Sequence, residues 1–183
     1  FNNALPRTIR ETKELFELPG ACYPLEMCFM GGEASFGSAY RITLCGGPFC
    51  GIVYVWAYRH TRDVKLLRER IYPFLREVVR FFAAFMEKGD DGRYHLPPTV
   101  PAEIFTLSRD SIAELALLRP CLELAIEASR MFDVDSDERG QWEDVLAHYP
   151  SYPTKRGVIA DGSDIPLKHP SHYTYRLHPV VLA

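Results

Sequence analysis

The most regular pattern in the chain is the spacing of apolar residues between positions 64 and 88. Apolar side chains recur there at intervals of four, three, four, three and four residues: Leu67, Ile71, Phe74, Val78, Phe81 and Phe85. Such intervals place all of them on one face of an α-helix, so the segment predicts an amphipathic helix. Asp63 precedes it as a candidate cap, and Pro73 is expected to kink or restart it because proline has no backbone N–H to donate.

A shorter amphipathic helix is predicted over residues 7–18. Its apolar residues fall at near-helical spacing with charges between them: Ile9, Leu15 and Phe16. Pro19 and Gly20 end the run. Residues 20–51 then carry many glycines and most of the cysteines but no sustained period, so they predict a long ordered loop. Loops of that length inside compact domains are usually functional when they are too apolar to be disordered.

The next helix is predicted over residues 49–60 and is expected to be buried on most sides, because it is largely apolar. One face carries residues at helical spacing: Phe49, Val53, Trp56 and His60. The same helix is rich in aromatic residues that could stack on a sugar: Phe49, Tyr54, Trp56 and Tyr58. On so apolar a helix, we expect most of these rings in the core and at most one facing a cleft.

Two further helices are predicted in the second half of the chain. Residues 111–132 carry a stripe of apolar side chains at helical spacing: Leu115, Leu118, Leu122, Ala125 and Phe132. We expect Asp110 or Ser108 to cap this helix and Pro120 to bend it. Ser136 is expected to cap the last helix, in which three residues should face inward: Trp142, Val145 and Leu146.

No strand pattern longer than a few residues lies between these helices, and residues 150–183 predict mostly loop. The fold class is therefore all-α, with helices paired through loops that alternate between short and long. With 47% hydrophobic residues, the 183-residue chain can bury the core of one domain. The chain begins at Phe1 and ends in an apolar run, so we expect residues 1–183 to be part of a longer protein.

Charge and composition exclude several classes of partner. The 21 Lys and Arg against 24 Asp and Glu give a net charge of -3, without a basic stripe that would bind nucleic acid. No apolar run approaches the ~20 residues of a membrane span, and no signal-peptide layout starts the chain. We expect a soluble protein, whether cytoplasmic, periplasmic or secreted. The five cysteines show no metal or disulfide spacing and are expected to be buried free thiols.

One short segment combines stiffness, apolar surroundings and a lone acid: "HLPPTVPAEIF", residues 95–105. Its prolines restrict the backbone before Glu103. Apolar neighbours disfavour the charged form of a carboxyl group and raise its pKa, which would keep Glu103 protonated near neutral pH as a proton donor. The alternative is that Glu103 only complements the dipole of the helix that begins at about Ser108.

The order of features from residue 45 to residue 180 resembles the catalytic (α/α)6 barrel of glycoside hydrolase family 95, the α-L-fucosidase and α-L-galactosidase group. In that family, a helix with a Trp leads through an Arg-Asp turn into a "YPFL" helix. A Pro-Ser-x-Ser-Pro-Glu loop, a helix opened by Asp and a His-x-Ser-His motif follow. The matching positions are Trp56, Arg62-Asp63, Tyr72-Pro73-Phe74-Leu75, Glu103, Asp110 and His169-Pro170-Ser171-His172. Pro101-Ala102 replaces the family's Ser-Pro, and the family's "SHL" is "SHY" here.

The resemblance implies an inverting glycoside hydrolase. In this reaction one carboxylic acid protonates the leaving oxygen while a second group activates water. Glu103 stands in the place of the family's general acid, whereas the family's paired asparagines and its catalytic base would lie outside these residues. The resemblance also implies a carbohydrate substrate, with Glu26, His169 and His172 bonding sugar hydroxyls, and no cofactor.

These assignments have alternatives. Glu26 and the nearby Glu33 could be solvated loop carboxylates. The spacing of His169, His172 and His178 suggests a metal site, but no cysteine or carboxylate stands at ligand spacing, so we predict no metal. The whole chain could also be a non-catalytic carbohydrate-binding or scaffolding module of the same fold, or another (α/α)6 enzyme such as a lyase or phosphorylase.

Overall fold

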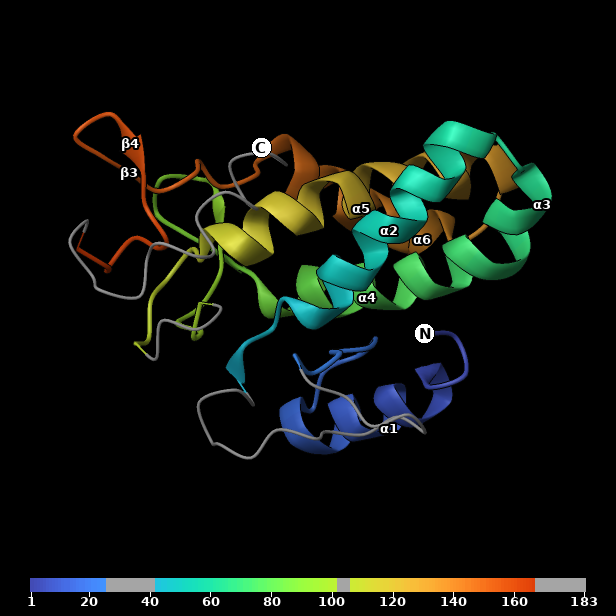
Figure 1. Ribbon diagram of the computed structural model, residues 1–183, viewed down its shortest axis with the longest axis horizontal. Coiled ribbons are helices and arrows are strands. Elements are labelled where there is room, and N and C mark those ends of the chain that lie inside the picture. Colours follow the sequence, from blue (N-terminus) through green and yellow to red (C-terminus); the bar gives the residue numbers. More distant parts are fainter. Residues whose placement is uncertain (26–41, 102–105, 167–183) are drawn as a thin grey trace.

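The computed structural model describes residues 1–25, 42–101 and 106–166, and helices dominate these ranges (Figure 1). The long helices are α1 (Leu5–Phe16), α2 (Gly46–Thr61), α4 (Tyr72–Phe85), α5 (Ile112–Phe132) and α6 (Ser136–Ala147). Two short antiparallel hairpins accompany them: β1 (Glu87–Lys88) with β2 (Tyr94–His95), and β3 (Thr154–Lys155) with β4 (Val158–Ile159). Because each strand has only two residues, the predicted all-α class is confirmed.

The segment predicted as a helix over residues 64–88 is helical as far as residue 85. It forms three consecutive elements: α3 (Val64–Leu66), the π-helical turn η2 (Leu67–Ile71) and α4. Asp63 caps the first of them, because its Oδ1 accepts from the backbone N–H of Leu66 at 2.9 Å. Pro73 lies in the first turn of α4, where its missing N–H costs nothing. The predicted cap and the predicted restart are therefore confirmed.

α5 lies at the centre of the helix cluster and contacts α2, α4 and α6 (Figure 1). The first four residues of its predicted stripe are each at most 1% exposed: Leu115, Leu118, Leu122 and Ala125. They share one hydrophobic core with the apolar residues predicted on one face of η2 and α4. Of those six residues, only Phe85 is partly exposed. α5 runs through Pro120 without ending.

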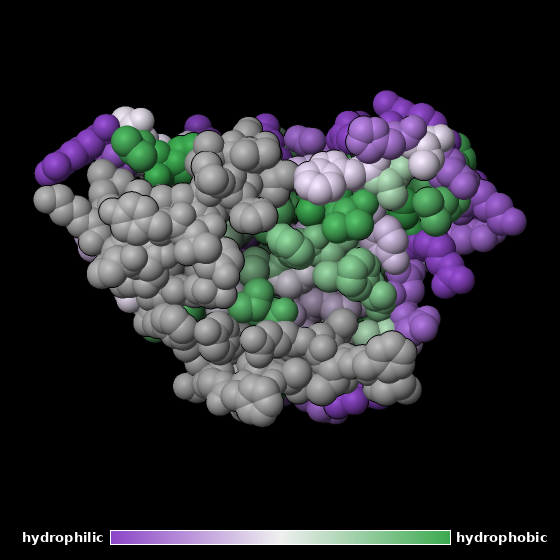
Figure 2. Space-filling model, in the orientation of Figure 1, coloured by the Kyte–Doolittle hydropathy of each residue, from purple (hydrophilic) through white to green (hydrophobic). Residues whose placement is uncertain are grey.

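α2 is less buried than predicted, because two of its aromatic rings and one valine are exposed instead of at most one ring. Phe49, Val53 and Trp56 are 51%, 47% and 48% exposed, and we call these three residues the outer face of α2. Figure 2 shows apolar residues at the surface where α2 runs. The buried side carries other residues: Gly51, Ile52, Val55 and Tyr58. A Cβ at Gly51 would lie 2.5 Å from the Sγ of Cys121, so the glycine is what lets α2 approach α5.

α1 also packs differently from the prediction. Leu15 is 75% exposed, whereas Thr8 and Thr12 are buried. The Thr12 hydroxyl donates to the carbonyl of Thr8 at 2.7 Å and accepts from the backbone N–H of Cys22 at 2.8 Å. These bonds satisfy the buried hydroxyl and tie the segment after α1 back to the helix. Thr12 thus faces the core, whereas Leu15, which the apolar spacing predicted to be buried, faces outward.

The N-terminal caps of the last two helices differ by one residue or more from the prediction. α5 has Ser111 as its N-cap instead of Asp110 or Ser108, and α6 has Asp135, so that Ser136 is the first helical residue. Neither N-cap bonds a helix N–H through its side chain. The predicted caps of α5 were wrong because the side chains of Asp110 and Ser108 bond other backbone groups, which the sequence does not reveal.

Four of the five cysteines lie in the described ranges, and all four are free thiols. Cys45 and Cys121 are buried, and Cys22 and Cys50 are partly buried. This agrees with the expectation for these four residues. Cys28 lies outside the described residues.

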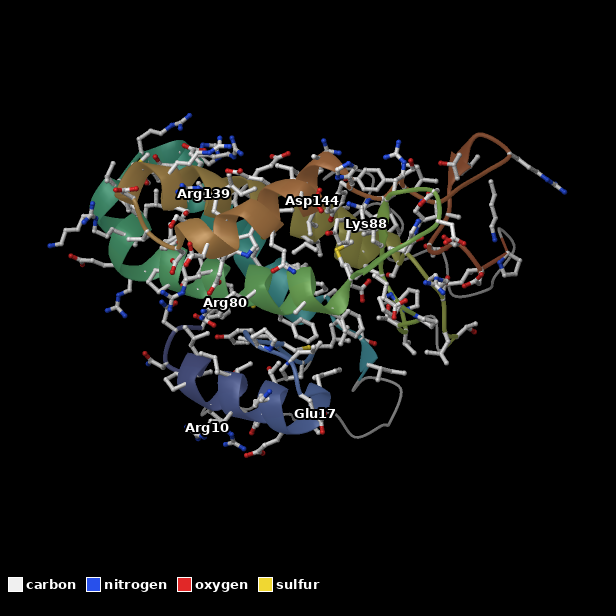
Figure 3. All side chains as sticks on the ribbon, turned by 180° about the vertical axis from the view of Figure 1, so that it is seen from behind. Arg10, Glu17, Arg80, Lys88, Arg139 and Asp144 are labelled. Atoms are coloured by element: carbon white, nitrogen blue, oxygen red, sulfur yellow. The ribbon has the colours of Figure 1, made fainter. Side chains whose placement is uncertain are left out.

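Ion pairs connect the surface of α6 to α4 and to the first hairpin (Figure 3). The Nε of Arg80 donates to Oε2 of Glu138 at 2.6 Å, and the Nζ of Lys88 lies 3.2 Å from Oδ2 of Asp144. Pairs this exposed contribute at most about 1 kcal/mol each, so the core decides the fold. Within the described ranges, no helix has both the length and the apolar character needed to cross a bilayer.

Candidate active site

The structure describes the ends of the segments that carry the predicted site residues. The residues themselves lie outside the described ranges: Glu26, Glu33, Glu103, His169, His172 and His178. Their roles therefore stay predictions. The described residues next to these segments show which parts of the site lie close together and what holds them.

The loop that contains Glu103 in the sequence has a hydrogen-bonded base. Thr99 and Ser108 form an antiparallel bridge, in which the N–H of Thr99 donates to the carbonyl of Ser108 at 3.0 Å and the N–H of Ser108 donates back at 2.8 Å. Next to this bridge, the backbone N–H of Leu96 donates to Oδ1 of Asp110 at 2.9 Å. Both sides of the loop are thus joined before the chain reaches residues 102–105.

Asp110 also holds the imidazole of His95. Its Oδ2 lies 2.8 Å from Nδ1 of His95, and Oδ1 of Asp91 lies 3.1 Å from Nε2 on the other side of the ring. The hydrogen bond to Asp110 is the main cause that raises the pKa of His95 above its ordinary value. Asp110 adopts a left-handed backbone with φ of 51°, which Asp tolerates better than most residues. This side chain joins the two sides of the loop, a role that the cap prediction did not foresee.

Segments from three parts of the chain meet at this base. The backbone N–H of Val100 donates to the carbonyl of Ile42 at 3.0 Å, directly after the segment with Glu26. The backbone N–H of Asp164 donates to Oγ of Ser108 at 3.0 Å, shortly before the segment with the histidines. α2 and α5 start at this same end of the helix cluster (Figure 1). The three segments that carry the predicted residues therefore begin or end within one region.

A buried carboxyl group lies in the same region, in the first turn of α5. Glu114 is 0% exposed. Its Oε1 accepts from the backbone N–H of Leu44 at 3.2 Å, and its Oε2 accepts from the hydroxyl of Ser111. Burial raises the pKa of Glu114 to about 7. The sequence reasoning missed this residue, although a single acid within "IAELALL" was a signal that could have found it.

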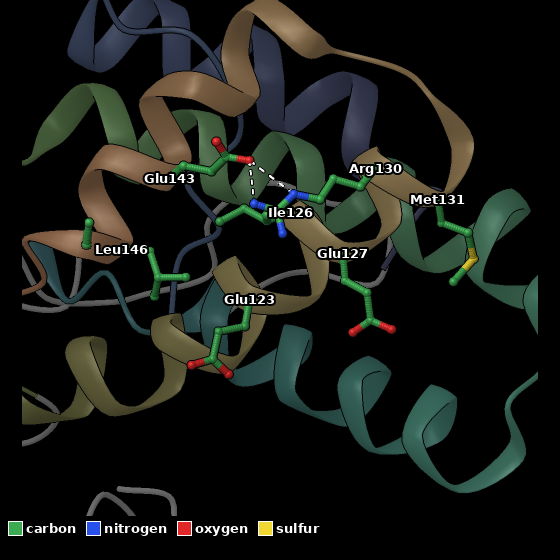
Figure 4. Close-up of a pocket in the computed structure, with 8 residues that line it drawn as sticks. Glu123, Ile126, Glu127, Arg130, Met131, Glu143 and Leu146 are labelled. Atoms are coloured by element: carbon green, nitrogen blue, oxygen red, sulfur yellow. Dashed lines mark hydrogen bonds and ion pairs between the residues drawn. The ribbon is translucent and has the colours of Figure 1, made fainter.

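A separate groove of about 780 Å³ runs between α5 and α6 (Figure 4). It is lined by Glu123, Ile126, Glu127, Arg130, Met131, Glu143, Leu146 and Ala147. The side chain of Arg130 extends across the groove, and its Nη2 donates to Oε1 of Glu143 at 2.9 Å. The lining comes from the second half of α5, away from the loop base, and includes none of the predicted site residues. We therefore assign the candidate site to the loop end of the helices and not to this groove.

The comparison with protein families decides the classification. The family model for the glycosyl hydrolase family 95 catalytic domain matches residues 2–161. The chain belongs to this family. The recognition made from the order of Trp56, the "YPFL" helix and the later motifs is thereby confirmed, and the protein is a member of a family of glycoside-active enzymes.

A comparison with solved structures supports the fold. A chain described as a putative kojibiose phosphorylase from human microbiome superposes with a TM-score of 0.71 at 14% sequence identity. The match covers 88% of this family 95 chain and 23% of that chain. The predicted part of an (α/α)6 barrel is confirmed. No curated protein sequence matches significantly.

Proposed function

We propose that this family 95 chain is part of the catalytic domain of an inverting glycosidase, with Glu103 as its general acid. The observation that carries the proposal is the hydrogen-bonded loop base, because a proton donor must be held at a fixed place relative to the leaving oxygen. Thr99, Ser108 and Asp110 join the two sides of the loop. Val100 and Pro101, the last described residues before Glu103, are buried, so the start of this loop is held in the core.

The proposed substrates are α-L-fucosides or α-L-galactosides, as the resemblance to the fucosidase group of the family implies. Glu26 would accept hydrogen bonds from sugar hydroxyls, and His169 and His172 would donate or accept through their ring nitrogens. The meeting of the three described segment ends supports this grouping. The catalytic base and the groups that orient the attacking water would come from outside these residues.

The experiment is an assay of the complete protein, because this chain spans 23% of the similar solved chain. Aryl α-L-fucosides and α-L-galactosides are incubated with the enzyme, and proton NMR follows the first sugar released. An inverting enzyme releases the β-anomer first, before mutarotation mixes the two forms. Release of the α-anomer would contradict the proposed mechanism, and binding without turnover would favour the non-catalytic module.

Phosphorolysis is the second candidate, favoured by the similar fold of the putative kojibiose phosphorylase. The same assays are repeated with α-linked glucose disaccharides, with and without inorganic phosphate. A phosphorylase would form a sugar phosphate and would need phosphate for turnover. The proposed hydrolase should instead leave the glucose disaccharides intact and release free sugar from the fucoside or galactoside at a rate that phosphate does not change.

A further inference from the structure

We propose that Glu114 is a positioning residue that fixes the segment before α2 relative to the loop that contains Glu103. The inference rests on the proposed function, because it concerns the relative placement of Glu26 and Glu103. No substrate contact is assigned to Glu114, which is completely buried. Its Oε1 instead joins the first turn of α5, the helix that follows the Glu103 loop, to the segment that ends before α2, and its Oε2 bonds Ser111, the N-cap of the same helix.

The contacts have a definite arrangement. Oε1 accepts from the N–H of Leu44, a residue 70 positions earlier that follows the segment with Glu26. Oε2 bonds the hydroxyl of Ser111, the N-cap of α5, which directly follows the base of the Glu103 loop. Leu44 and Ser111 are 2% and 0% exposed, so water does not replace either bond. The Glu114 side chain therefore holds the start of α5, which follows the Glu103 loop, against the segment that ends before α2.

The cost of the buried group argues for a specific role. A carboxyl group in the core costs free energy, and an apolar side chain of similar size often replaces a buried ionisable group without loss of stability. Among the described residues, the thiols of Cys22 and Cys45 interact electrostatically with Glu114, and burial raises the pKa of both thiols, which keeps them neutral. The two hydrogen bonds, and not a buried ion pair, are thus what this carboxyl group provides.

Both protonation states can keep the two contacts. Burial raises the pKa of Glu114 to about 7, so both forms are present near neutrality. The ionised form accepts from Leu44 and from the Ser111 hydroxyl. The protonated form can donate from Oε2 to Ser111 while Oε1 still accepts from Leu44. Glutamine has the same shape and can make the same two bonds, whereas methionine has similar size and can make neither.

The test compares Glu114→Gln with Glu114→Met in the complete protein, assayed on a fucoside with a poor leaving group. Glu114→Gln should keep kcat and KM within about twofold of wild type. Glu114→Met should lower kcat at least about tenfold with a smaller change in KM, because a displaced acid affects the transition state most. Glu127→Met is the matched control, since Glu127 is an exposed residue of the same helix, and it should leave both constants unchanged.

A double-mutant cycle separates positioning from a general loss of structure. In a Glu103→Gln background there is no acid left to position, so Glu114→Met should lower kcat less than about threefold further. Equal losses in both backgrounds would overturn the inference. The inference would also be overturned if Glu114→Met had a normal kcat while Glu103→Gln was impaired. That result would leave the proposed function intact. An unimpaired Glu103→Gln would instead contradict the proposed function itself.

Discussion

At the residue scale, the described part of the site depends on polar side chains that the hydrophobic pattern cannot identify. Asp110 occupies a sequence position typical of a helix cap, yet its oxygens bond Leu96 and His95. Glu114 has the helical position of a surface acid in a first turn, yet it is buried. The bonds of Asp110 to Leu96 and His95, and that of Glu114 to Leu44, span 14, 15 and 70 positions of the sequence. Local spacing carries no information about such long-range hydrogen bonds.

The buried Glu114 should make the protein less stable as the pH rises. Burial raises its pKa from 4.5 to about 7, so the folded state holds the proton more tightly than the unfolded state. The stability that this group contributes is complete below pH 4.5 and is lost as the pH rises to about 7. Glu114→Gln, which stays neutral, should therefore gain up to ~3 kcal/mol relative to wild type between pH 5 and pH 8.

Denaturant unfolding at pH 5 and pH 8 measures this difference. The control is Glu127→Gln, because Glu127 is exposed on the same helix and should show no pH-dependent difference from wild type. A Glu114→Gln variant whose stability differs from wild type by the same amount at both pH values would contradict a raised pKa for Glu114.

At the element scale, the sequence predicted the helices well and their orientations less well. Helices were expected in each segment where the described structure has a long one, and the proline restart before α4 was correct, because local sterics decide it. α2 was expected to be buried on most sides because it is largely apolar, yet one of its apolar sides is exposed in the described structure. The deciding feature is Gly51, which lets α2 approach α5 closely. A glycine in the sequence of an apolar helix does not show which neighbouring helix packs closely against it.

The close approach at Gly51 predicts a sensitivity to small substitutions. In Gly51→Ala, the new Cβ would lie 2.5 Å from Sγ of Cys121 and 3.1 Å from a methyl group of Leu75. We expect a loss of about 1–3 kcal/mol in the free energy of unfolding, from strain that outweighs the better helix propensity of alanine. Thermal and denaturant unfolding of the variant measure the loss.

Gly140→Ala provides the matched control for this prediction. Gly140 lies in α6, and a Cβ added there would meet no neighbouring group of the described residues within 4 Å. Alanine should therefore stabilise the helix by about 0.5–1 kcal/mol. Cys121→Ala should relieve part of the strain in Gly51→Ala. Equal effects of the two glycine substitutions would show that α2 does not approach α5 as described.

At the scale of the whole molecule, the sequence predicted the fold class and the family but could not assemble the site. The order of motifs along the chain sufficed for family recognition. The meeting of segments 42–45, 95–101 and 106–111 depends on backbone hydrogen bonds such as Val100 to Ile42, for which no residue type is required. Such contacts leave no pattern in a single sequence.

The outer face of α2 should behave differently in this chain alone and in the complete protein. Phe49, Val53 and Trp56 are about half exposed here, and the chain spans 23% of the similar solved chain. We expect other helices of the barrel to cover this face. The double substitution Val53→Lys with Trp56→Glu should therefore make the isolated chain more monodisperse, because an exposed apolar patch promotes association.

In the complete protein, the same two substitutions should lower the melting temperature, because they would put charges into a packed interface. Light scattering on the isolated chain and thermal unfolding of the complete protein measure the two effects. A complete protein that tolerates both substitutions without a lower melting temperature would contradict a covered face. A monodisperse, cooperatively melting wild-type chain would contradict the expected association.

The central claim is that Glu103 donates the proton to the leaving oxygen, and its most direct test is the leaving-group dependence of Glu103→Gln in the complete protein. Loss of a general acid affects substrates with poor leaving groups most, because good leaving groups need little protonation. We predict that kcat/KM for an alkyl α-L-fucoside falls at least about a hundredfold, but for a 2,4-dinitrophenyl fucoside less than about tenfold. Equal losses for both substrates, or full activity on both, would contradict the assignment.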